Sequence, residues 1–183
     1  MQVSDSMCAV LKHNSLFIVS PGLMNALSAN SEIAMANKKV LPPTYLFISI
    51  VLMLMLHFLL PLYEVITYPW ILIGCLPLLL GITLNLIADN AFRMFNTTVK
   101  PFQESTVLIT TGAFRFTRHP MYLGMILILF GIAILMGSLT PFFVVPVFAG
   151  LMDQTFVKME ERMLVEKFGK TWLEYSSNVR KWL

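Results

Sequence analysis

Two short clusters of side chains in this sequence could do chemistry at a membrane surface. The first is the run at residues 118–124, R-H-P-M-Y-L-G, which sets two cations, a proline and a phenol at the start of an apolar stretch. The second is the carboxylate pair Glu160-Glu161, which follows the next apolar stretch. Cations suit a bound anion, and a carboxylate suits a bound ammonium. If the fold brings the two clusters together, they predict a site for one small zwitterion.

The proline in the first cluster predicts how the anion would be held. Pro120 is expected at the first position of a helix, where its missing amide N–H costs nothing. The free amides of that first turn, with the helix dipole and the pair Arg118-His119, would attract a carboxylate. Glu160 or Glu161 would then take an ammonium. A molecule that carries both groups is an amino acid or a cofactor derived from one.

Two simpler explanations cover part of this pattern. The charges could form an interfacial ion pair that closes a helical hairpin, or Arg118 could be a cationic anchor at the edge of the membrane. Neither explanation accounts for His119, Pro120 and Tyr122 beside the arginine. We therefore expect a binding site.

The composition indicates where such a site would lie. Of the 183 residues, 57% are hydrophobic and 13% are charged, whereas soluble domains average about 25% charged residues. The excess is gathered into runs long enough to cross a bilayer. We predict an all-α polytopic membrane protein with about four transmembrane helices, or five if one lies within residues 1–40, and an amphipathic helix after the last span on the cytoplasmic side. The expected spans are residues 44–62, 70–88, 120–136 and 141–157.

The lengths of the last two spans bring the clusters together. Each contains 17 residues, and the turn at residues 137–140 joins them. At 1.5 Å per residue each is about 25 Å long. The hairpin therefore returns Glu160-Glu161 to the same membrane face as residues 118–122.

The basic residues predict which face that is. They fall in the segments before the first span, between the second and third, and after the fourth, while the opposite connections carry Glu64 and no Lys or Arg. The positive-inside rule puts the site in the cytoplasm. This dispersed charge fits membrane topology, so we expect no nucleic-acid partner. Cys8 and Cys75 are far apart, and neither a disulfide framework nor a metal site is expected.

We divide the chain into an N-terminal extension, residues 1–40, and a membrane domain, residues 41–183, whose catalytic part is residues 97–183. The extension could be an interfacial helix or poorly ordered. The linker at 97–117 carries apolar residues at intervals, so we expect it to fold against the domain.

Some polar and aromatic residues allow two interpretations. His57 could be functional or a hydrogen-bonded residue near a helix end. Asn85 and Asp89 share a helical face and could be a polar wall of the site or a solvated helix end. Trp172 and Trp182 suit the headgroup zone of a bilayer.

The string R-H-P-x-Y-x-G, an apolar hairpin and E-E resembles the integral-membrane methyltransferases typified by isoprenylcysteine carboxyl methyltransferase, and more distantly the phosphatidylethanolamine N-methyltransferases. The resemblance covers about residues 106–175, including Thr111-Gly112 before the motif and Phe168-Gly169 after it. It implies S-adenosylmethionine as cofactor, S-adenosylhomocysteine as product, and a lipophilic or lipidated acceptor that enters from the bilayer.

The resemblance also implies roles for individual residues. His119, Pro120, Tyr122 and Glu160 match the cofactor-binding positions, Thr106, Val107, Leu108 and Ile109 match the segment that lines the nucleoside, and Phe114 stands where relatives often have tyrosine. Glu160 matches the glutamate at the methionine end. We assign Arg118 and Glu161 to the catalytic step.

One position departs from the carboxyl methyltransferases. They place a substrate-binding arginine four residues before the glutamate, and this chain has Phe156 there. The nearest cation along the sequence is Lys158 or Arg162. The departure weakens the expectation of an isoprenylcysteine carboxylate as acceptor and leaves the cofactor prediction intact.

Two other functions compete with methyl transfer. A membrane reductase of the sterol type would use NADPH, but it would need more spans and further cations for the extra phosphates. A non-catalytic membrane scaffold would bind no cofactor at all. The acceptor group, whether carboxylate, amine or thiol, and the oligomeric state stay open.

Overall fold

The computed structural model describes residues 41–60, 63–95 and 107–182. The chain divides into two compact units, Met1–Lys39 and Val40–Leu183, and every described residue belongs to the second. The interpretations of residues 1–40 and of residues 97–106 in the linker therefore fall outside the described part. In the described part of the linker, Ile109 and Phe114 are buried, as expected for a segment folded against the domain.

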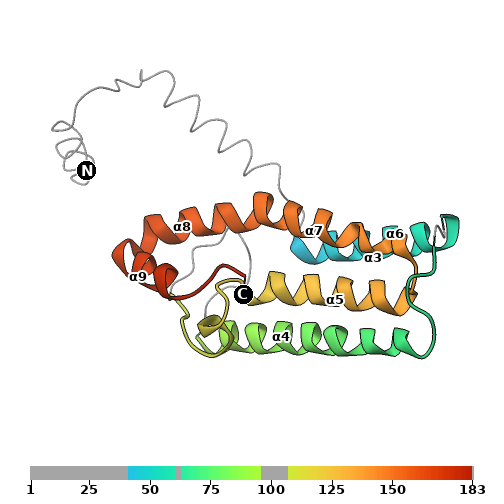
Figure 1. Cartoon of the computed structure of the whole chain (residues 1–183). Coiled ribbons are helices and arrows are strands. Elements are labelled where there is room, and N and C mark those ends of the chain that lie inside the picture. The colour runs from blue at the N-terminus through green and yellow to red at the C-terminus, as the bar shows by residue number, and fades with distance from the viewer. Residues whose placement is uncertain (1–40, 61–62, 96–106, 183) are drawn as a thin grey trace, which may run out of the picture. The chain divides into compact units, whose positions relative to one another are not determined.

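The second unit is built from helices (Figure 1). In chain order they are α3 (Pro42–Leu59), the 3-10 turn η1 (Trp70–Gly74), α4 (Cys75–Met94), the 3-10 turn η2 (Gly112–Arg115), α5 (Pro120–Met136), α6 (Leu139–Phe142), α7 (Val144–Met152), the π-helix η3 (Asp153–Val157), α8 (Lys158–Phe168) and α9 (Lys170–Asn178). The only β pairing in the described residues is an isolated bridge between Glu64 and Ser138. The predicted all-α class is confirmed.

Three helical runs are long and apolar enough to cross a membrane: Pro42–Leu59, Trp70–Met94 and Leu139–Phe168. A fourth apolar helix, Pro120–Met136, has 17 residues, and its bounds agree with the predicted third span. These helices confirm the polytopic membrane architecture.

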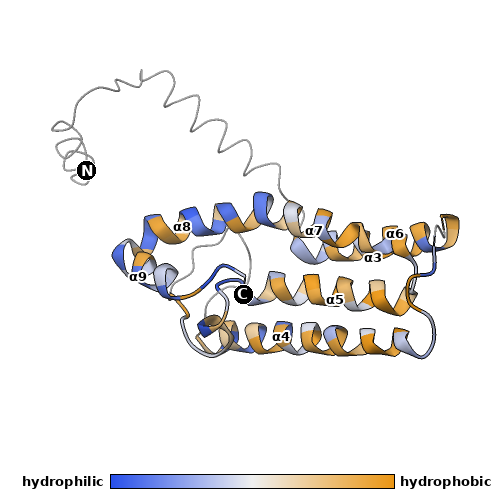
Figure 2. Cartoon of the chain, in the orientation of Figure 1, coloured by the Kyte–Doolittle hydropathy of each residue, from blue (hydrophilic) through white to orange (hydrophobic). Residues whose placement is uncertain are grey.

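The last run is longer than the predicted span. Its 30 residues form about 45 Å of helix, more than the roughly 30 Å hydrocarbon core of a bilayer. Within residues 139–157 the one charged residue is Asp153, whereas α8 beyond them carries six charged residues. Figure 2 shows this change from the apolar α7 to the polar α8 and α9. The membrane-spanning part therefore ends at the π-helix, and α8 projects past it.

Helix α5 lies at the centre of the fold. Its residues Leu129 and Ala133 are fully buried, with α4 on one side and α3 and α7 on another. A Cβ atom on Gly81 of α4 would lie 2.5 Å from the carbonyl oxygen of Gly124 on α5, so only glycine allows this approach. Small residues at such contacts let membrane helices pack backbone to backbone. The close α4–α5 pair fixes the start of α5 relative to the end of α4.

The polar residues with two interpretations each have a partner in the described part of the chain. His57 Nδ1 lies 2.7 Å from Ser138 Oγ, so it ties α3 to the turn after α5. Asn85 donates to the carbonyl oxygen of Gly81 one turn earlier. Asp89 pairs with Arg93 at 2.8 Å, as at a solvated helix end.

Candidate functional site

The entry to α5 is fixed by hydrogen bonds from the residues before it. His119 is the N-cap residue and Pro120 opens the helix, as the sequence predicts. The His119 amide donates to Thr117 Oγ1 at 3.3 Å. Thr117 in turn donates to the carbonyl oxygen of Lys181 at 3.0 Å, and the Arg118 amide donates to that of Arg180 at 3.1 Å. The residues that follow α9 therefore set the position of the R-H-P motif.

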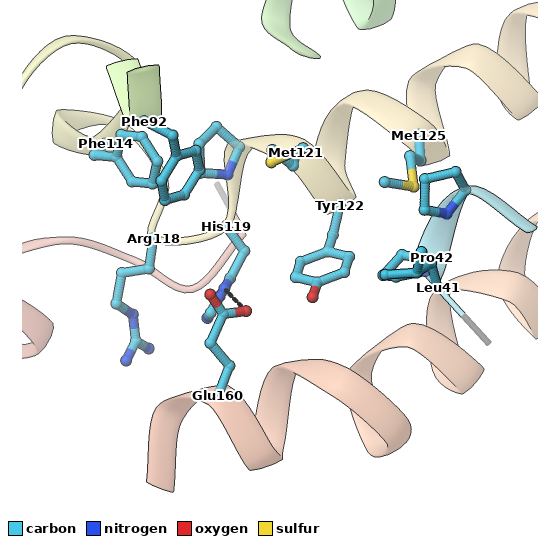
Figure 3. A pocket seen from close by; sticks show the side chains of 12 residues that line it. Leu41, Pro42, Phe92, Phe114, Arg118, His119, Met121, Tyr122, Met125 and Glu160 are labelled. Atoms are coloured by element: carbon cyan, nitrogen blue, oxygen red, sulfur yellow. Dashed lines mark ion pairs between the residues drawn. The ribbon is translucent and has the colours of Figure 1, made fainter. Parts of the chain in front are cut away.

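The two clusters meet, as the hairpin geometry predicts. His119 lies between the two carboxylates, with Nδ1 3.8 Å from Glu160 Oε2 and Nε2 3.3 Å from Glu161 Oε1. Arg118 Nη1 lies 3.0 Å from the same Glu161 oxygen. Figure 3 shows Glu160 reaching from α8 toward His119 and the hydroxyl of Tyr122. Residues some forty positions apart in sequence thus form one polar cluster.

Glu161 is held by cations. The hydrogen bond with His119 is the main cause that lowers its pKa, and Arg118 and Lys181 add to the effect, while partial burial opposes it. Glu161 is therefore a charged group tied to its neighbours. It lines neither of the two cavities described below, because its oxygens face Arg118, His119 and Lys181.

Glu160 differs from its neighbour. Its side chain is 31% exposed, but within the described part of the chain its buried Oε2 atom has no hydrogen-bond partner. Burial raises the pKa of Glu160, with Glu161 adding to the rise, while His119 and Tyr122 oppose it. A shielded carboxylate oxygen with an open coordination position suits a cationic ligand.

A first cavity, of about 160 Å³, opens beside Glu160 (Figure 3). Its polar edge is formed by Arg118, His119, Tyr122 and Glu160, and its apolar wall includes Leu41, Pro42, Pro43, Met121 and Met125. The cavity joins the polar cluster to the apolar faces of α3 and α5. A ligand there would meet charge at one end and hydrocarbon at the other.

A second cavity, of about 30 Å³, shares part of its lining with the first. Phe92, Phe114, Arg118 and Glu160 line both cavities, and the second adds Val107, Leu108, Ile109, Leu164, Trp172 and Tyr175. The Tyr175 hydroxyl donates to the carbonyl oxygen of Phe114 at 2.6 Å, which docks α9 on η2. Burial raises the pKa of Tyr175 to about 12, so its hydroxyl stays protonated at neutral pH.

The structure brings together nearly all the site residues that the sequence singles out. Val107, Leu108 and Ile109 line the second cavity, His119, Pro120 and Tyr122 line the first, and Phe114, Arg118 and Glu160 line both. Glu161 contacts Arg118 and His119 and lines neither cavity. Thr106 lies outside the described residues.

One interpretation from the sequence needs correction. Trp172 is 3% exposed and lies 5.9 Å from the Arg118 guanidinium, so it is a wall of the site rather than a headgroup anchor. Lys158 and Arg162, the cations nearest in sequence to Phe156, are exposed on α8. The cations beside Glu161 are Arg118, at 3.0 Å, and Lys181, at 3.9 Å.

Sequence reasoning missed several residues of the site. Pro42 and Pro43 were not singled out, yet they line the first cavity with Met121 and Met125. The methionines face inward because α5 is central, which the uniform apolarity of the helix could not indicate. Asp153 was not singled out either, although a charge directly after an apolar run is a recognisable signal.

Comparisons with known proteins agree with this site. A family model described as phospholipid methyltransferase matches residues 69–171. The chain is 32% identical over 122 residues to a protein-S-isoprenylcysteine O-methyltransferase of Saccharomyces cerevisiae, a match that covers 64% of this chain and 50% of that protein. The likeness to the family expected from the motif is confirmed.

A solved structure has the same fold. It is described as a eukaryotic intramembrane Ras methyltransferase, isoprenylcysteine carboxyl methyltransferase, and it superposes with a TM-score of 0.57 at 22% sequence identity. The match covers 91% of this chain and 54% of that one, so the chain spans about half the length of both relatives. Since the family model covers more than half of the chain, including the R-H-P motif and both glutamates, the protein belongs to the phospholipid methyltransferase family.

Proposed function

We propose that this protein is a membrane methyltransferase that uses S-adenosylmethionine and methylates a lipophilic acceptor reaching the site from the bilayer. The observation that carries the proposal is the Glu160 carboxylate, whose buried Oε2 atom has no hydrogen-bond partner in the described residues and borders a cavity that is polar at one end and apolar at the other. The distribution of Lys and Arg supports a site on the cytosolic face.

The residues present fit the amino-acid end of this cofactor. Glu160 would accept the ammonium. Arg118 Nε is buried without a hydrogen-bond partner among the described residues and could donate to the carboxylate. The first hydrogen bond within α5 is donated by Leu123 to the His119 carbonyl, so the amides of Met121 and Tyr122 precede it. Free amides at a helix N-terminus favour an anion.

The second cavity supports binding of the nucleoside. Its aliphatic residues Val107, Leu108 and Ile109 face the aromatic Trp172 and Tyr175, a lining that suits a flat, partly apolar ring. At about 30 Å³ the cavity is too small for an adenosine. We expect its side chains to move apart when the cofactor binds.

The proposed chemistry demands little of the protein beyond placement. When bound, S-adenosylmethionine supplies a methyl group already activated by its sulfonium, so alignment with the acceptor and exclusion of water are the main tasks. Phe92 and Phe114, which line both cavities, would shield the space between donor and acceptor from water. Arg118 and Glu161, our predicted catalytic pair, would hold His119 and the methionine end in position. A carboxylate or thiolate acceptor needs no base, whereas an amine would have to arrive neutral.

The acceptor is proposed by class only. The apolar wall of the first cavity, with Leu41, Pro42 and Met125, supports a lipid chain or a lipidated residue. The name of the yeast relative specifies an isoprenylcysteine. Phe156 makes a carboxylate less favoured than in that group of enzymes, because a phenylalanine offers the carboxylate no cation.

The test is a calorimetric titration of S-adenosylhomocysteine into the full chain in lipid nanodiscs, with NADPH as the control titrant. We expect binding of S-adenosylhomocysteine alone. Binding of NADPH alone would favour a reductase. A folded protein that bound neither would contradict the cofactor and favour a scaffold.

A further inference from the structure

We propose that Lys181 is a positioning residue. It holds the Glu161 carboxylate in place, and Glu161 in turn sets the positions of Arg118 and His119 for cofactor binding. This inference rests on the proposed function. Lys181 belongs to residues 179–182, which follow α9 and are called the strap below.

The strap lies against the R-H-P motif. Two successive carbonyl oxygens, of Arg180 and Lys181, accept hydrogen bonds from the Arg118 amide and the Thr117 hydroxyl at 3.1 and 3.0 Å. The ring of Trp182 lies 6.4 Å from that of His119 and packs against the main apolar core. These contacts fix the backbone of the strap and leave the Lys181 side chain directed at α8.

The Lys181 ammonium bridges two carboxylates of the long helix. It forms an ion pair with Asp153 Oδ1 and lies 3.9 Å from Glu161 Oε2. Asp153 opens the π-helix η3 and Glu161 lies in the first turn of α8. π turns inside helices are frequent at functional sites. Here the π turn separates the apolar α7 from the charged α8, and Lys181 connects its two sides.

The two oxygens of Glu161 face different partners. Oε1 contacts Arg118 and His119, which border the first cavity, while Oε2 faces Lys181. Lys181 also neutralises Asp153, so that this second carboxylate does not repel Glu161. Without the ammonium, two carboxylates would face each other, and Glu161 would be free to turn away from His119.

If Lys181 served only to stabilise the fold, its ion pair with Asp153 would have to contribute substantially to stability. Lys181 is 25% exposed and Asp153 26%, so the pair is only partly shielded and its direct contribution to stability is small. We expect the effect of Lys181 on cofactor binding to exceed its effect on stability, because Arg118 and His119 depend on Glu161 for their position. Lys181 is also one of the groups that lower the pKa of Glu161.

The experiment measures S-adenosylhomocysteine affinity from pH 5.5 to 8.5 in nanodiscs for Lys181→Met, Lys181→Arg and the double variant Asp153→Asn/Lys181→Met. The matched control is Lys170→Met, at an exposed lysine on α9. We expect Lys181→Met to weaken binding about three- to tenfold. We also expect the loss of binding at low pH to begin at a higher pH than in the wild type. The conservative Lys181→Arg should restore both, and the control should match the wild type.

The double variant separates positioning from folding. It removes both charges of the Asp153–Lys181 pair, so no unpaired Asp153 carboxylate repels Glu161, but Glu161 still lacks the Lys181 ammonium. We expect it to bind more weakly than the wild type and less weakly than Lys181→Met. Wild-type affinity in the double variant, or in Lys181→Met itself, would overturn the role of Lys181. Absence of binding by the wild type would instead overturn the proposed function.

Discussion

The two ends of the α5–α7 hairpin carry buried polar groups of opposite character. At the turn end, His57 pairs with Ser138, the Thr140 hydroxyl donates to the Leu60 carbonyl at 3.1 Å, and the Leu139 amide donates to the Tyr63 carbonyl at 3.0 Å. At the charged end, three buried atoms lack hydrogen-bond partners in the described residues: Glu160 Oε2, Arg118 Nε and Asp153 Oδ1, the last of which is ion-paired with Lys181.

This difference separates a structural cluster from a binding site. Buried polar atoms in folded proteins are nearly always satisfied, so those left open call for an explanation. The turn end holds α3 and α5 together and needs nothing more. Apart from Asp153 Oδ1, which is ion-paired with Lys181, the open atoms at the charged end have opposite electrostatic preference: Glu160 Oε2 suits a cation and Arg118 Nε suits an anion, as a zwitterionic ligand requires.

The largest expected effect is at the open carboxylate. Glu160→Gln removes the charge that would meet the ammonium, and we expect S-adenosylhomocysteine to bind roughly 10- to 100-fold more weakly, the usual range for a charged hydrogen bond. Calorimetry in nanodiscs provides the measurement. The melting temperature should not fall, because the substitution relieves a poorly solvated charge. Unchanged affinity would remove Glu160 from the site.

The pH dependence of binding should reflect the same group. A bound cation favours the ionised carboxylate, so Glu160 has a lower pKa in the complex than in the free protein. Binding is then strongest above the free-protein pKa and weakens as pH falls through it, by at most about tenfold per pH unit. Because burial raises that pKa, the loss should begin at higher pH than for an ordinary glutamate. A profile that Glu160→Gln leaves unchanged would argue against this assignment.

A substitution at the turn end should lower the stability of the protein and leave cofactor binding unaffected. Ser138→Ala leaves the partly buried imidazole of His57 without its partner, and we expect a loss of about 1 kcal/mol in the free energy of unfolding. Denaturant melts of the variant in micelles would measure it. Since the site lies at the other end of the hairpin, S-adenosylhomocysteine affinity should be unchanged. An equal loss of affinity would show that the two ends are coupled.

A smaller effect is expected where α9 docks on η2. Tyr175→Phe removes the hydrogen bond to the Phe114 carbonyl, which we expect to weaken S-adenosylhomocysteine binding about two- to fivefold, as one neutral hydrogen bond is worth about 1 kcal/mol. Calorimetry against Ser176→Ala, whose hydroxyl bonds only within α9 at 3.0 Å, provides the comparison. Affinities that agree between the two variants would mean that Tyr175 does not shape the cavity.

The backbone of the site could be predicted from the sequence because few geometries were open to it. Pro120 marks a helix start, and Gly137, in the left-handed conformation at φ 69°, ends the same helix. Two apolar segments of equal length joined by a turn must return to the same face. The proximity of Arg118 to Glu161 follows from those constraints.

The rest depends on contacts that no local pattern specifies. Trp172 and Lys181 reach the site because the chain reverses after Gly169 and again after α9. An amphipathic pattern on a membrane surface looks the same whether its aromatic face meets lipid or the protein. The hydrophobic pattern likewise does not specify the π-helix η3, because the polar residues Asp153 and Gln154 at its start indicate a change of environment and not a π turn.

The most direct test of a zwitterion site compares S-adenosylhomocysteine with its deaminated analogue, which lacks only the ammonium. Calorimetric titrations of both ligands into the wild type and Glu160→Gln complete a thermodynamic cycle. We expect the wild type to prefer S-adenosylhomocysteine by about tenfold or more, and Glu160→Gln to bind the two ligands about equally. Equal binding by the wild type, or a preference that persists in Glu160→Gln, would contradict the assignment of Glu160 to the ammonium.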